Sequence, residues 1–265
     1  MTAPVTLITG ASAGIGAALA HVFAERGRAL VLVARREPQL KAVADAIEAR
    51  GRRRPRLMIT DIAQPGATEK IDAELRAAGL EVQFLVNNAG FGLMGEATSL
   101  DRSEQLAMVD LNARVLTELS LRFIDSMTRH KGGILNVASV ASFMPGPGMA
   151  VYHATKAYVL SFTEALHQEL KPQGVRVTAL CPGPVETEFQ ARAGMPDGYF
   201  PPKFARSAER VAHEGYKGLM RNKRIVVPGF DNQVMALLPR LLSRQWMLSL
   251  IVKYRASRKP LTNSP

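Results

Sequence analysis

The first 36 residues constrain the fold most, because they have the pattern of a strand, a glycine-rich turn, a helix and a second strand. Val5–Thr9 is a short apolar run rich in β-branched residues, which is typical of a buried parallel strand. The turn Gly10–Gly16 leads into a helical segment over Ala17–Arg26, and a second apolar run follows over 29–34. This order predicts a βαβ unit, whose helix begins with unpaired backbone N–H groups that can bind a pyrophosphate.

The glycines of this turn, Gly10, Gly14 and Gly16, have the spacing Gly-x-x-x-Gly-x-Gly. The commonest dinucleotide fingerprint has a different spacing, Gly-x-Gly-x-x-Gly. An ordinary strand-to-helix turn is the alternative interpretation. We favour a phosphate-binding turn because a complete βαβ pattern surrounds it, and because side chains at these positions would hold phosphates away from the backbone.

Two arginines, Arg35 and Arg36, follow the second predicted strand, where an acidic residue would bind the ribose 2′-OH of NAD. A carboxylate there would repel a 2′-phosphate, whereas a guanidinium can pair with it through a bidentate fork. The arginines therefore predict NADP(H) as the cofactor. The alternative for either residue is a solvated surface charge.

Apolar runs near residues 5, 30, 57, 84, 134, 175 and 225 alternate with helical stretches along the 265 residues. This alternation predicts an α/β protein: a single-domain Rossmann fold with a doubly wound, seven-stranded parallel sheet flanked by helices. No repeat or linker divides the chain. We expect an NADP-binding catalytic domain over 1–230, including a substrate loop over 188–205, and a basic amphipathic helical extension of the same domain over 231–265.

Tyr152 and Lys156 are four residues apart in a segment of helical composition, so one helical turn would place them on the same face. The ordinary pKa of tyrosine is about 10, so a phenol transfers protons at neutral pH only if a nearby cation favours its ionised form. Lys156 is placed to be that cation. The pair predicts proton transfer to or from a substrate oxygen.

Several motifs occur together, namely Thr9–Gly16, Asn87–Gly90, Ser139 thirteen residues before Tyr152, Tyr152-x-x-x-Lys156, and Pro182–Thr187. In this order and at these spacings they resemble the classical short-chain dehydrogenases/reductases. The resemblance covers residues 5 to 190 approximately. It implies an enzyme that interconverts a carbonyl group and an alcohol by hydride transfer with a nicotinamide cofactor.

The resemblance implies a catalytic role for each of four side chains. Ser139 would hydrogen-bond the substrate carbonyl, and Tyr152 would act as general acid in reduction and general base in oxidation. Lys156 would lower the pKa of Tyr152 and hydrogen-bond the nicotinamide ribose. Asn112 would hold a water that relays the proton from solvent through Lys156.

The resemblance also implies the cofactor contacts. Asp61 would meet the adenine amino group, although a turn carboxylate is the alternative for this residue. Thr187 would lie over the nicotinamide amide, although its hydroxyl can instead cap the next helix. The predicted cofactor-binding residues are Gly10, Ser12, Ala13, Gly14, Ile15, Gly16, Arg35, Arg36, Asp61, Ile62, Asn88, Ala89, Gly90, Tyr152, Lys156, Pro182, Gly183, Val185 and Thr187.

Composition narrows the partners and the compartment. The net charge of +11 would permit attraction to nucleic acid or anionic lipid, but no nucleic-acid-reading motif accompanies the basic segment Arg50–Arg56, so we expect no nucleic-acid partner. Cys181 is the only cysteine, the first strand begins too early for a signal peptide, and no apolar run could span a membrane, which predicts a cytoplasmic protein. The histidines show no metal-ligand spacing, so no metal site is expected.

Apolar segments rich in Gly and Pro, over 143–149 and 189–204, would border the catalytic pocket and predict an apolar or acyl-type substrate. The stretch 234–255 has the pattern of a basic amphipathic helix, with Pro239 near its start. Such a helix can lie in a membrane interface, or it can pack on its own domain or a neighbouring subunit, and we favour packing. The family resemblance implies a homodimer or homotetramer.

We favour an NADP(H)-dependent oxidoreductase acting on a small-molecule ketone, aldehyde or alcohol, because Asn112, Ser139, Tyr152 and Lys156 are all present. The alternative is a dinucleotide-binding regulatory or membrane-associated scaffold protein with incidental turnover. A protein retained only for binding would not need all of these side chains.

Overall fold

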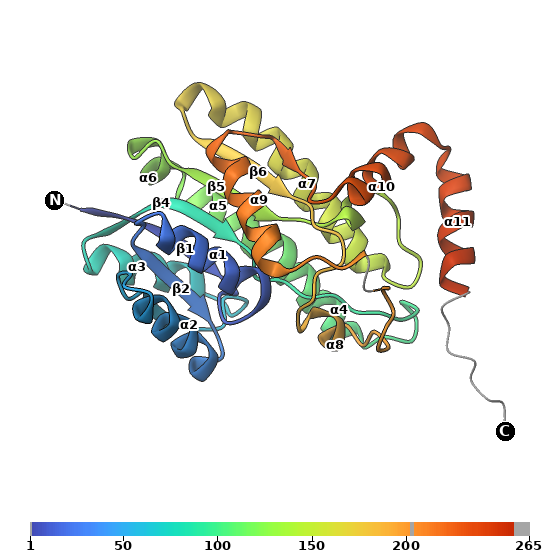
Figure 1. The fold of residues 1–265 in the computed structure, drawn as a ribbon, viewed down its shortest axis with the longest axis horizontal. Coiled ribbons are helices and arrows are strands. Elements are labelled where there is room, and N and C mark those ends of the chain that lie inside the picture. The colour runs from blue at the N-terminus through green and yellow to red at the C-terminus, as the bar shows by residue number, and fades with distance from the viewer. Residues whose placement is uncertain (1, 202–203, 257–265) are drawn as a thin grey trace.

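The computed structural model describes residues 2–201 and 204–256, and its centre is a single sheet of seven strands with the order β3-β2-β1-β4-β5-β6-β7 (Figure 1). Every neighbouring pair is parallel. The strands are β1 (Ala3–Thr9), β2 (Leu30–Ala34), β3 (Arg56–Ile59), β4 (Leu80–Asn87), β5 (Gly133–Val137), β6 (Arg176–Leu180) and β7 (Ile225–Val226). The predicted seven-stranded, doubly wound Rossmann fold is confirmed.

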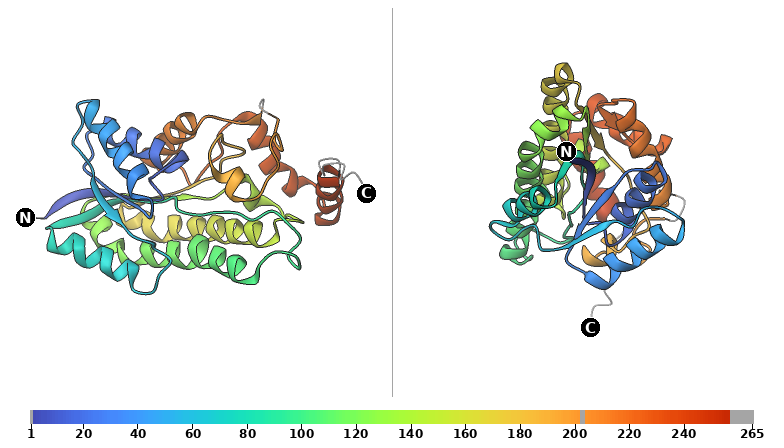
Figure 2. Two further views of the ribbon diagram at one scale, coloured as in Figure 1. Left: turned by 90° about the horizontal axis from the view of Figure 1, so that it is seen from below. Right: turned by 90° about the vertical axis from the view of Figure 1, so that its left-hand side faces the viewer.

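Helices cover both faces of this sheet (Figure 2). One layer contains α1 (Gly14–Glu25), α2 (Glu37–Ala49) and α9 (Ala208–Met220), and the other contains α3 (Ala67–Ala77), α5 (Leu116–Arg122), α6 (Ile124–Arg129) and α7 (Ala150–Leu170). Successive strand side chains point to opposite faces, so Ile8 and Leu32 pack under the first layer while Leu7 and Val31 pack under the second. Both faces of the central strands are therefore buried, which explains their apolar sequences, whereas β3 at the edge exposes Arg56 and Ile59.

The remaining helices are shorter or lie at the carboxyl-terminal side of the chain. They are α4 (Arg102–Val109), the π-helix η1 (Asp110–Val115), the 3₁₀-helices η2 (Val140–Phe143) and η3 (Lys171–Gln173), α8 (Phe189–Arg192), α10 (Phe230–Leu241) and α11 (Arg244–Ala256). The short helix α8 lies within the predicted substrate loop. Residues 202–203 of that loop and 257–265 of the predicted extension lie outside the described residues.

The sheet reverses its winding direction at β1 and β4, because β2 and β3 extend from one side of this pair and β5 to β7 from the other. Ligands of doubly wound sheets bind outside the carboxyl ends of the strands at such a reversal. The segments that follow β1, β4, β5 and β6 carry the motifs found in the sequence. The fold therefore gathers these motifs at one edge of the sheet.

Two helix predictions were wrong in their limits. Helix α1 begins at Gly14 rather than Ala17, because the last glycines of the turn already form its first turn. The stretch 234–255 is not one helix: Leu242 has an extended backbone, and the hydroxyl of Ser243 accepts a hydrogen bond from the backbone N–H of Trp246 at 3.3 Å. Ser243 thus caps a second helix, while Pro239 lies inside the first.

Candidate active site

The glycine-rich turn packs directly against the segment that follows β4. A Cβ built at Gly16 would lie 2.3 Å from the carbonyl oxygen of Gly10, and one built at Gly10 would lie 2.8 Å from the Cα of Ala89. The amide of Asn88 donates to the carbonyl oxygens of Thr9 and Gly10, both at 3.0 Å. Backbone contact this close admits no side chain, so the glycines form a cradle whose shape Asn88 holds in place.

Thr9 fixes the same junction from the end of β1. Its hydroxyl accepts hydrogen bonds from the backbone N–H groups of Asn88 and Ala89, both at 3.1 Å, and donates to Val86 at 3.3 Å. Thr9 belongs to the first motif of the sequence, but no role was predicted for it. Its hydroxyl, at the end of a predicted strand, is the feature that could have indicated one.

Helix α1 points its amino-terminal end at this cradle. Ala13 is its N-cap residue and no side chain caps the helix, so its first N–H groups are left to donate hydrogen bonds to an anion. A Cβ built at Gly14, whose φ is +54°, would lie 2.9 Å from the Cγ2 of Thr187. A glycine cradle followed by an uncapped helix suits a pyrophosphate. Thr187, in the segment after β6, lies beside this cradle at Gly14.

Arg36 connects this cradle to the segment after β6. Its guanidinium donates to the hydroxyl of Ser12 at 3.4 Å and forms an ion pair with Glu188 at 2.7 Å. Arg36 is therefore not simply a solvated charge. A negatively charged group that bound here would compete with Glu188 for the guanidinium.

Arg35 and Asp61 face one another at the ends of β2 and β3. Their side chains form an ion pair at 3.5 Å, and Arg35 is 70% exposed. Asp61 also accepts a hydrogen bond from the backbone N–H of Ala63 at 3.1 Å, which is the turn contact weighed as its alternative role. Ile62 is buried beside it in the second core layer.

Tyr152 is buried on α7 and faces η2 and α8. A hydrogen bond joins its phenol to the hydroxyl of Ser139, the N-cap residue of η2. Its ring lies 5.3 Å from the ring of Phe189, measured between centroids. Burial raises the pKa of Tyr152 to about 12, and the hydrogen bond from Ser139 opposes that shift only in part.

Lys156 lies one turn further along α7, as predicted, and it is buried as well. Its ammonium donates to the carbonyl oxygen of Val137 at 2.8 Å and lies 5.9 Å from the centre of the Tyr152 ring. Burial lowers the pKa of Lys156 to about 8. Loss of hydration dominates both groups and disfavours both charges, so the net pKa of Tyr152 is raised in this structure, and the lowering effect expected of Lys156 stays a prediction.

Asn112 lies in the π-helical turn η1 between α4 and α5. Its side-chain oxygen accepts from the N–H of Phe91 at 3.1 Å, and its amide donates to the carbonyl of Phe91 at 2.9 Å and to Thr155 at 3.1 Å. A Cβ built at Gly90 would lie 2.8 Å from the Asn112 oxygen and 3.6 Å from the Lys156 nitrogen. Such π-helical turns occur often at functional sites, and this one brings Asn112 next to Lys156 across Gly90.

The segment after β6 holds Ser139 from the other side. The carbonyl of Pro182 accepts a hydrogen bond from the N–H of Val140 at 2.9 Å, and the Ser139 hydroxyl lies 3.5 Å from the same oxygen. A Cβ built at Gly183 would lie 2.2 Å from the side-chain oxygen of Asn232 on α10. Asn232 was missed by the sequence analysis because it belongs to no motif and meets Gly183 only in the folded chain.

The structure thus brings Asn112, Ser139, Tyr152 and Lys156 together at one edge of the sheet. Ile15 and Val185 pack on the first core layer at the same edge. Arg35, Asp61 and Ile62 lie apart from these four, around β2 and β3. The arrangement is extended, as a dinucleotide site must be.

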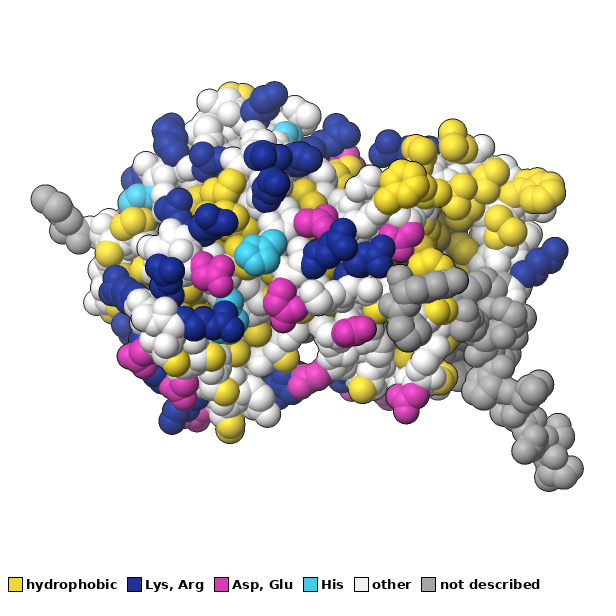
Figure 3. All heavy atoms as spheres, in the orientation of Figure 1, with side chains coloured by type: hydrophobic (Ala, Val, Ile, Leu, Met, Phe, Trp, Pro, Cys, Tyr) yellow, Lys and Arg dark blue, Asp and Glu magenta, His cyan; other side chains and the backbone are white. Residues whose placement is uncertain are grey.

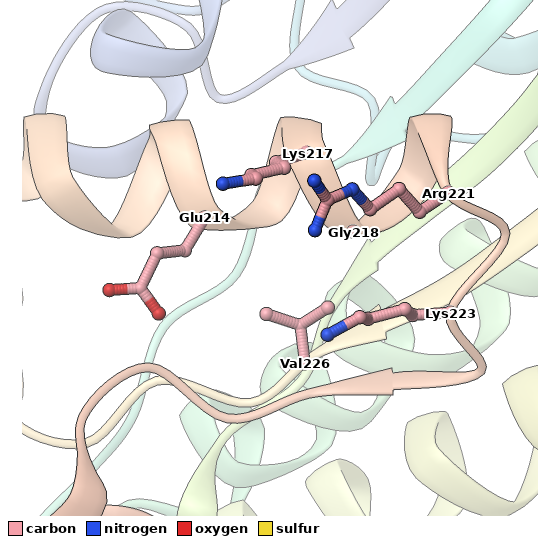
Figure 4. Close-up of a pocket in the computed structure, with 6 residues that line it drawn as sticks. All are labelled: Glu214, Lys217, Gly218, Arg221, Lys223 and Val226. Atoms are coloured by element: carbon pink, nitrogen blue, oxygen red, sulfur yellow. The ribbon is translucent and has the colours of Figure 1, made fainter.

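A cavity of about 280 Å³ lies elsewhere, between α9 and β7 (Figure 4). It is lined by Glu214, Lys217, Gly218, Arg221, Lys223 and Val226. None of these residues contributes to the arrangement around Tyr152. The candidate active site is therefore the arrangement of side chains around Tyr152, and this cavity lies outside it. Within the described residues no group of His, Cys, Asp and Glu side chains could hold a metal ion.

Comparison with known proteins defines the class. The family model described as short chain dehydrogenase matches residues 4–196. The chain therefore belongs to the short-chain dehydrogenase/reductase family, and it is an oxidoreductase that interconverts carbonyl groups and alcohols with a nicotinamide dinucleotide.

Individual relatives agree with this assignment. Sulfoacetaldehyde reductase 2 of Chromohalobacter salexigens is 38% identical over 188 residues, which are 70% of this chain and 74% of the relative. A short-chain dehydrogenase of Sphingobium yanoikuyae, solved in complex with NADPH, has a TM-score of 0.78 and 29% identity, covering 99% of this chain and 98% of that one. The bulky-bulky ketone specific alcohol dehydrogenase of Comamonas testosteroni has a TM-score of 0.74 and 25% identity, covering 100% and 98%.

Proposed function

We propose that this enzyme reduces an apolar ketone or aldehyde with NADPH, using Tyr152 as the proton donor. The observation that carries this proposal is the buried Tyr152 phenol, hydrogen-bonded to Ser139 and one helical turn from Lys156, at the carboxyl edge of the sheet. When bound, the cofactor supplies the hydride. The chain's own residues orient the carbonyl and deliver the proton.

The proposed proton transfer follows from these positions. The Ser139 hydroxyl donates to the substrate carbonyl oxygen and holds it beside the phenol. Tyr152 then gives its proton to the oxygen as negative charge develops there. A phenol with a pKa raised to about 12 is protonated at neutral pH, which is the state that reduction requires. Lys156 favours the tyrosinate that remains, and Asn112, which lies next to Lys156 across Gly90, would hold the water that relays the next proton.

The preference for NADPH over NADH rests on Arg35 and Arg36. Both lie at the end of β2, and the Arg36 guanidinium already reaches Ser12 in the cradle. The NADPH complex of the Sphingobium yanoikuyae dehydrogenase supports this proposal. Replacing Arg35 by Ala should raise the KM for NADPH about tenfold and leave the KM for NADH nearly unchanged, since about 1–2 kcal/mol of charge-assisted hydrogen bonding would be lost. An equal effect on both cofactors would contradict a 2′-phosphate contact.

The apolar substrate is proposed from the side chains around Tyr152. Leu93 and Met108 are buried next to it, with Phe91, Met149 and Phe189 packed against them. Arg192, which could clamp a carboxylate, instead pairs with Glu104 at 3.1 Å and lies over the ring of Phe91. The Comamonas testosteroni enzyme, described as specific for bulky-bulky ketones, supports the same substrate class.

A ketone panel tests the proposed function. NADPH oxidation should be measured with neutral ketones carrying bulky apolar groups on both sides, and with 2-oxo acids of matched size. We expect turnover with the neutral ketones and little with the acids, because the acid would have to displace Glu104 from Arg192. Preference for the acids, or for NADH throughout, would contradict the proposal.

We also propose that the enzyme is a homodimer or homotetramer. Apolar side chains on α4 and α5 are exposed, including Leu106 at 59% and Leu121 at 55%, and would be covered in an oligomer. Light scattering coupled to gel filtration measures the oligomeric state, and a monomer at micromolar concentration would contradict this proposal.

A further inference from the structure

Helices α10 and α11 expose many apolar side chains, which form the patch of hydrophobic atoms at the right of Figure 3. Phe230 is 80% exposed, Leu241 72% and Trp246 69%. We call this set the C-terminal apolar surface; it comprises Phe230, Val234, Met235, Leu237, Leu238, Leu241, Leu242, Trp246, Leu248, Leu250 and Val252. Monomeric proteins that remain in water seldom expose so many neighbouring apolar side chains.

Only a few side chains anchor these helices to the rest of the protein. Asn232 and Ala236 of α10 and Met247 of α11 are buried. We favoured packing on the same domain or on a neighbouring subunit from the sequence; most of the apolar residues of this stretch do not pack on their own domain, and the packing on a neighbouring subunit stays a prediction. Their exposure leaves them free to contact a partner.

The charge of this region identifies that partner. Residues 232–265 contain six Lys and Arg and no Asp or Glu. Arg240, Arg244 and Lys253 are exposed, and no carboxylate pairs with them in the described part of the chain. Asp231, the nearest acidic residue, forms an ion pair with Arg206. The segment 232–265, which carries most of the apolar surface, thus has positive charges and no negative ones, and it complements an anionic surface.

A second copy of this chain is a poor occupant for the same reason. A two-fold interface brings the same surface of both subunits together, so these cations would face their own copies, and residues 232–265 offer no carboxylate to pair with them. Lipid headgroups carry the opposite charge, and acyl chains accept the apolar side chains. No helix in the described residues is long and apolar enough to cross a membrane, so the contact would be at the surface of a bilayer.

Two further features fit a bilayer surface. Trp246 is the only tryptophan of the chain and is exposed, and tryptophan is one of the two side chains enriched at the interface between lipid and water. The chain also carries a net charge of +11, although the Lys and Arg side chains on the face shown in Figure 3 are interspersed with Asp and Glu. These cations would add to the attraction toward anionic headgroups.

We propose that α10 and α11 dock the enzyme onto anionic lipid bilayers, with the C-terminal apolar surface buried at the level of the headgroups. The buried Asn232 of α10 lies against Gly183, so the docked surface adjoins the catalytic edge of the sheet. An apolar carbonyl dissolved in the bilayer would then lie close to the pocket. The docking itself does not depend on the proposed reaction.

Flotation with vesicles tests this proposal on the full chain. Phosphatidylcholine vesicles with and without phosphatidylserine should be mixed with the protein at low and high salt. We expect flotation with the phosphatidylserine vesicles, weakened about tenfold or more by omitting the anionic lipid or by raising the salt. The fluorescence of Trp246 should shift to shorter wavelength in the same samples, since the indole would leave water.

Paired variants separate insertion from charge. Leu241→Glu/Leu250→Glu should abolish flotation and the fluorescence shift. Gln245→Glu/Ser249→Glu adds the same charges to exposed positions of α11 without removing apolar side chains, and it should retain part of the binding. Unchanged circular dichroism and melting temperature would show that both variants fold.

Three results would overturn the proposal. One is the absence of flotation with anionic vesicles at low salt. Another is equal binding of the two paired variants, which would show that the apolar side chains do not insert. The third is a concentration-dependent dimer in which Trp246 is shielded from acrylamide without lipid, because this would show that a second copy covers the surface.

Discussion

The cofactor side and the carboxyl-terminal side of the catalytic edge are built in different ways. Around β1 and α1, backbone meets backbone: a Cβ at Gly16 would approach the Gly10 carbonyl oxygen to 2.3 Å. Beyond β6, contacts are made by side chains, as where Asn232 fills the space beside Gly183. The side chains of the C-terminal apolar surface are packed least tightly of the three, since they are largely exposed to solvent.

This difference teaches why one side carries a recognisable motif and the other does not. Where two backbone segments approach this closely, only glycine fits, so such a contact is visible in the sequence as a glycine motif. A contact between side chains can be made by many combinations of residues, and an exposed apolar helix constrains only its own periodicity. The carboxyl-terminal side can therefore vary with the substrate while the cofactor side stays fixed.

Within the cofactor cradle, the largest expected effect of a single methyl group is at Gly16. In Gly16→Ala the added Cβ would meet the Gly10 carbonyl oxygen at 2.3 Å and the Asn88 amide at 2.4 Å, so the cradle must open. We expect a loss of stability of about 3 kcal/mol and loss of cofactor binding, measured by urea unfolding and by cofactor fluorescence titration. The matched control is Gly27→Ala, where φ is +74° but no atom lies within 4 Å; it should cost about 1 kcal/mol and leave binding intact. Equal losses in the two variants would show that the cradle is not tightly packed.

Gly183→Ala should have a smaller effect, and one that can be reversed. Its Cβ would lie 2.2 Å from the Asn232 oxygen, which belongs to a side chain and not to backbone. We expect a loss of about 1–3 kcal/mol and a lower kcat/KM. The double variant Gly183→Ala/Asn232→Ala should be more stable than the sum of the single effects predicts, because removal of the amide makes room for the methyl group. Strict additivity would show that the two residues do not compete for this space.

The smallest predicted effect is a pH dependence of stability that comes from Lys156. Burial lowers its folded-state pKa from 10.5 to about 8, so between these values the unfolded chain binds a proton that the folded chain does not. Stability should therefore rise with pH above 8, by about 1 kcal/mol between pH 7 and pH 9. Urea unfolding of the wild type and of Lys156→Met measures it as the difference between their pH profiles. Parallel profiles would mean that Lys156 titrates normally.

Tyr152 acts in the opposite sense at higher pH. Its folded-state pKa of about 12 exceeds the ordinary value of 10, so the folded chain keeps a proton that the unfolded chain loses. The contribution of Tyr152 to the free energy of unfolding therefore decreases as the pH rises from 10 toward 12. The window from pH 7 to pH 9 isolates Lys156 because Tyr152 is protonated in both states there.

The sequence was sufficient for the sheet and for most of the catalytic edge, because these depend on apolar strand runs and on glycines. It did not reveal the ion pair between Arg36 and Glu188, since 152 residues separate the partners and either one alone is an ordinary surface charge. Nor did it reveal the π-helical turn at Asn112, which depends on how α4 and α5 join. The raised pKa of Tyr152 was also missed, because spacing along a helix gives the distance to Lys156 but not the loss of hydration.

The break at Leu242 shows the same limit at a local scale. Ser243 has the residue type that begins helices, but the sequence over 234–255 continues the amphipathic pattern across it. The apolar residues of α10 and α11 are exposed because α10 points away from the rest of the domain. The direction of α10 depends on the folded chain and could not be predicted from the sequence.

The most direct test of the central claim is Tyr152→Phe, which removes one hydroxyl from the proposed proton donor and keeps the packing against Phe189. Turnover of the best ketone in the panel and the Kd for NADPH should be measured on the same preparation. We predict that kcat falls about a hundredfold to ten-thousandfold, as expected for loss of a general acid, while the Kd changes by less than about twofold. Turnover equal to that of the wild type, with NADPH still bound, would contradict the assignment of Tyr152 as the group that delivers the proton.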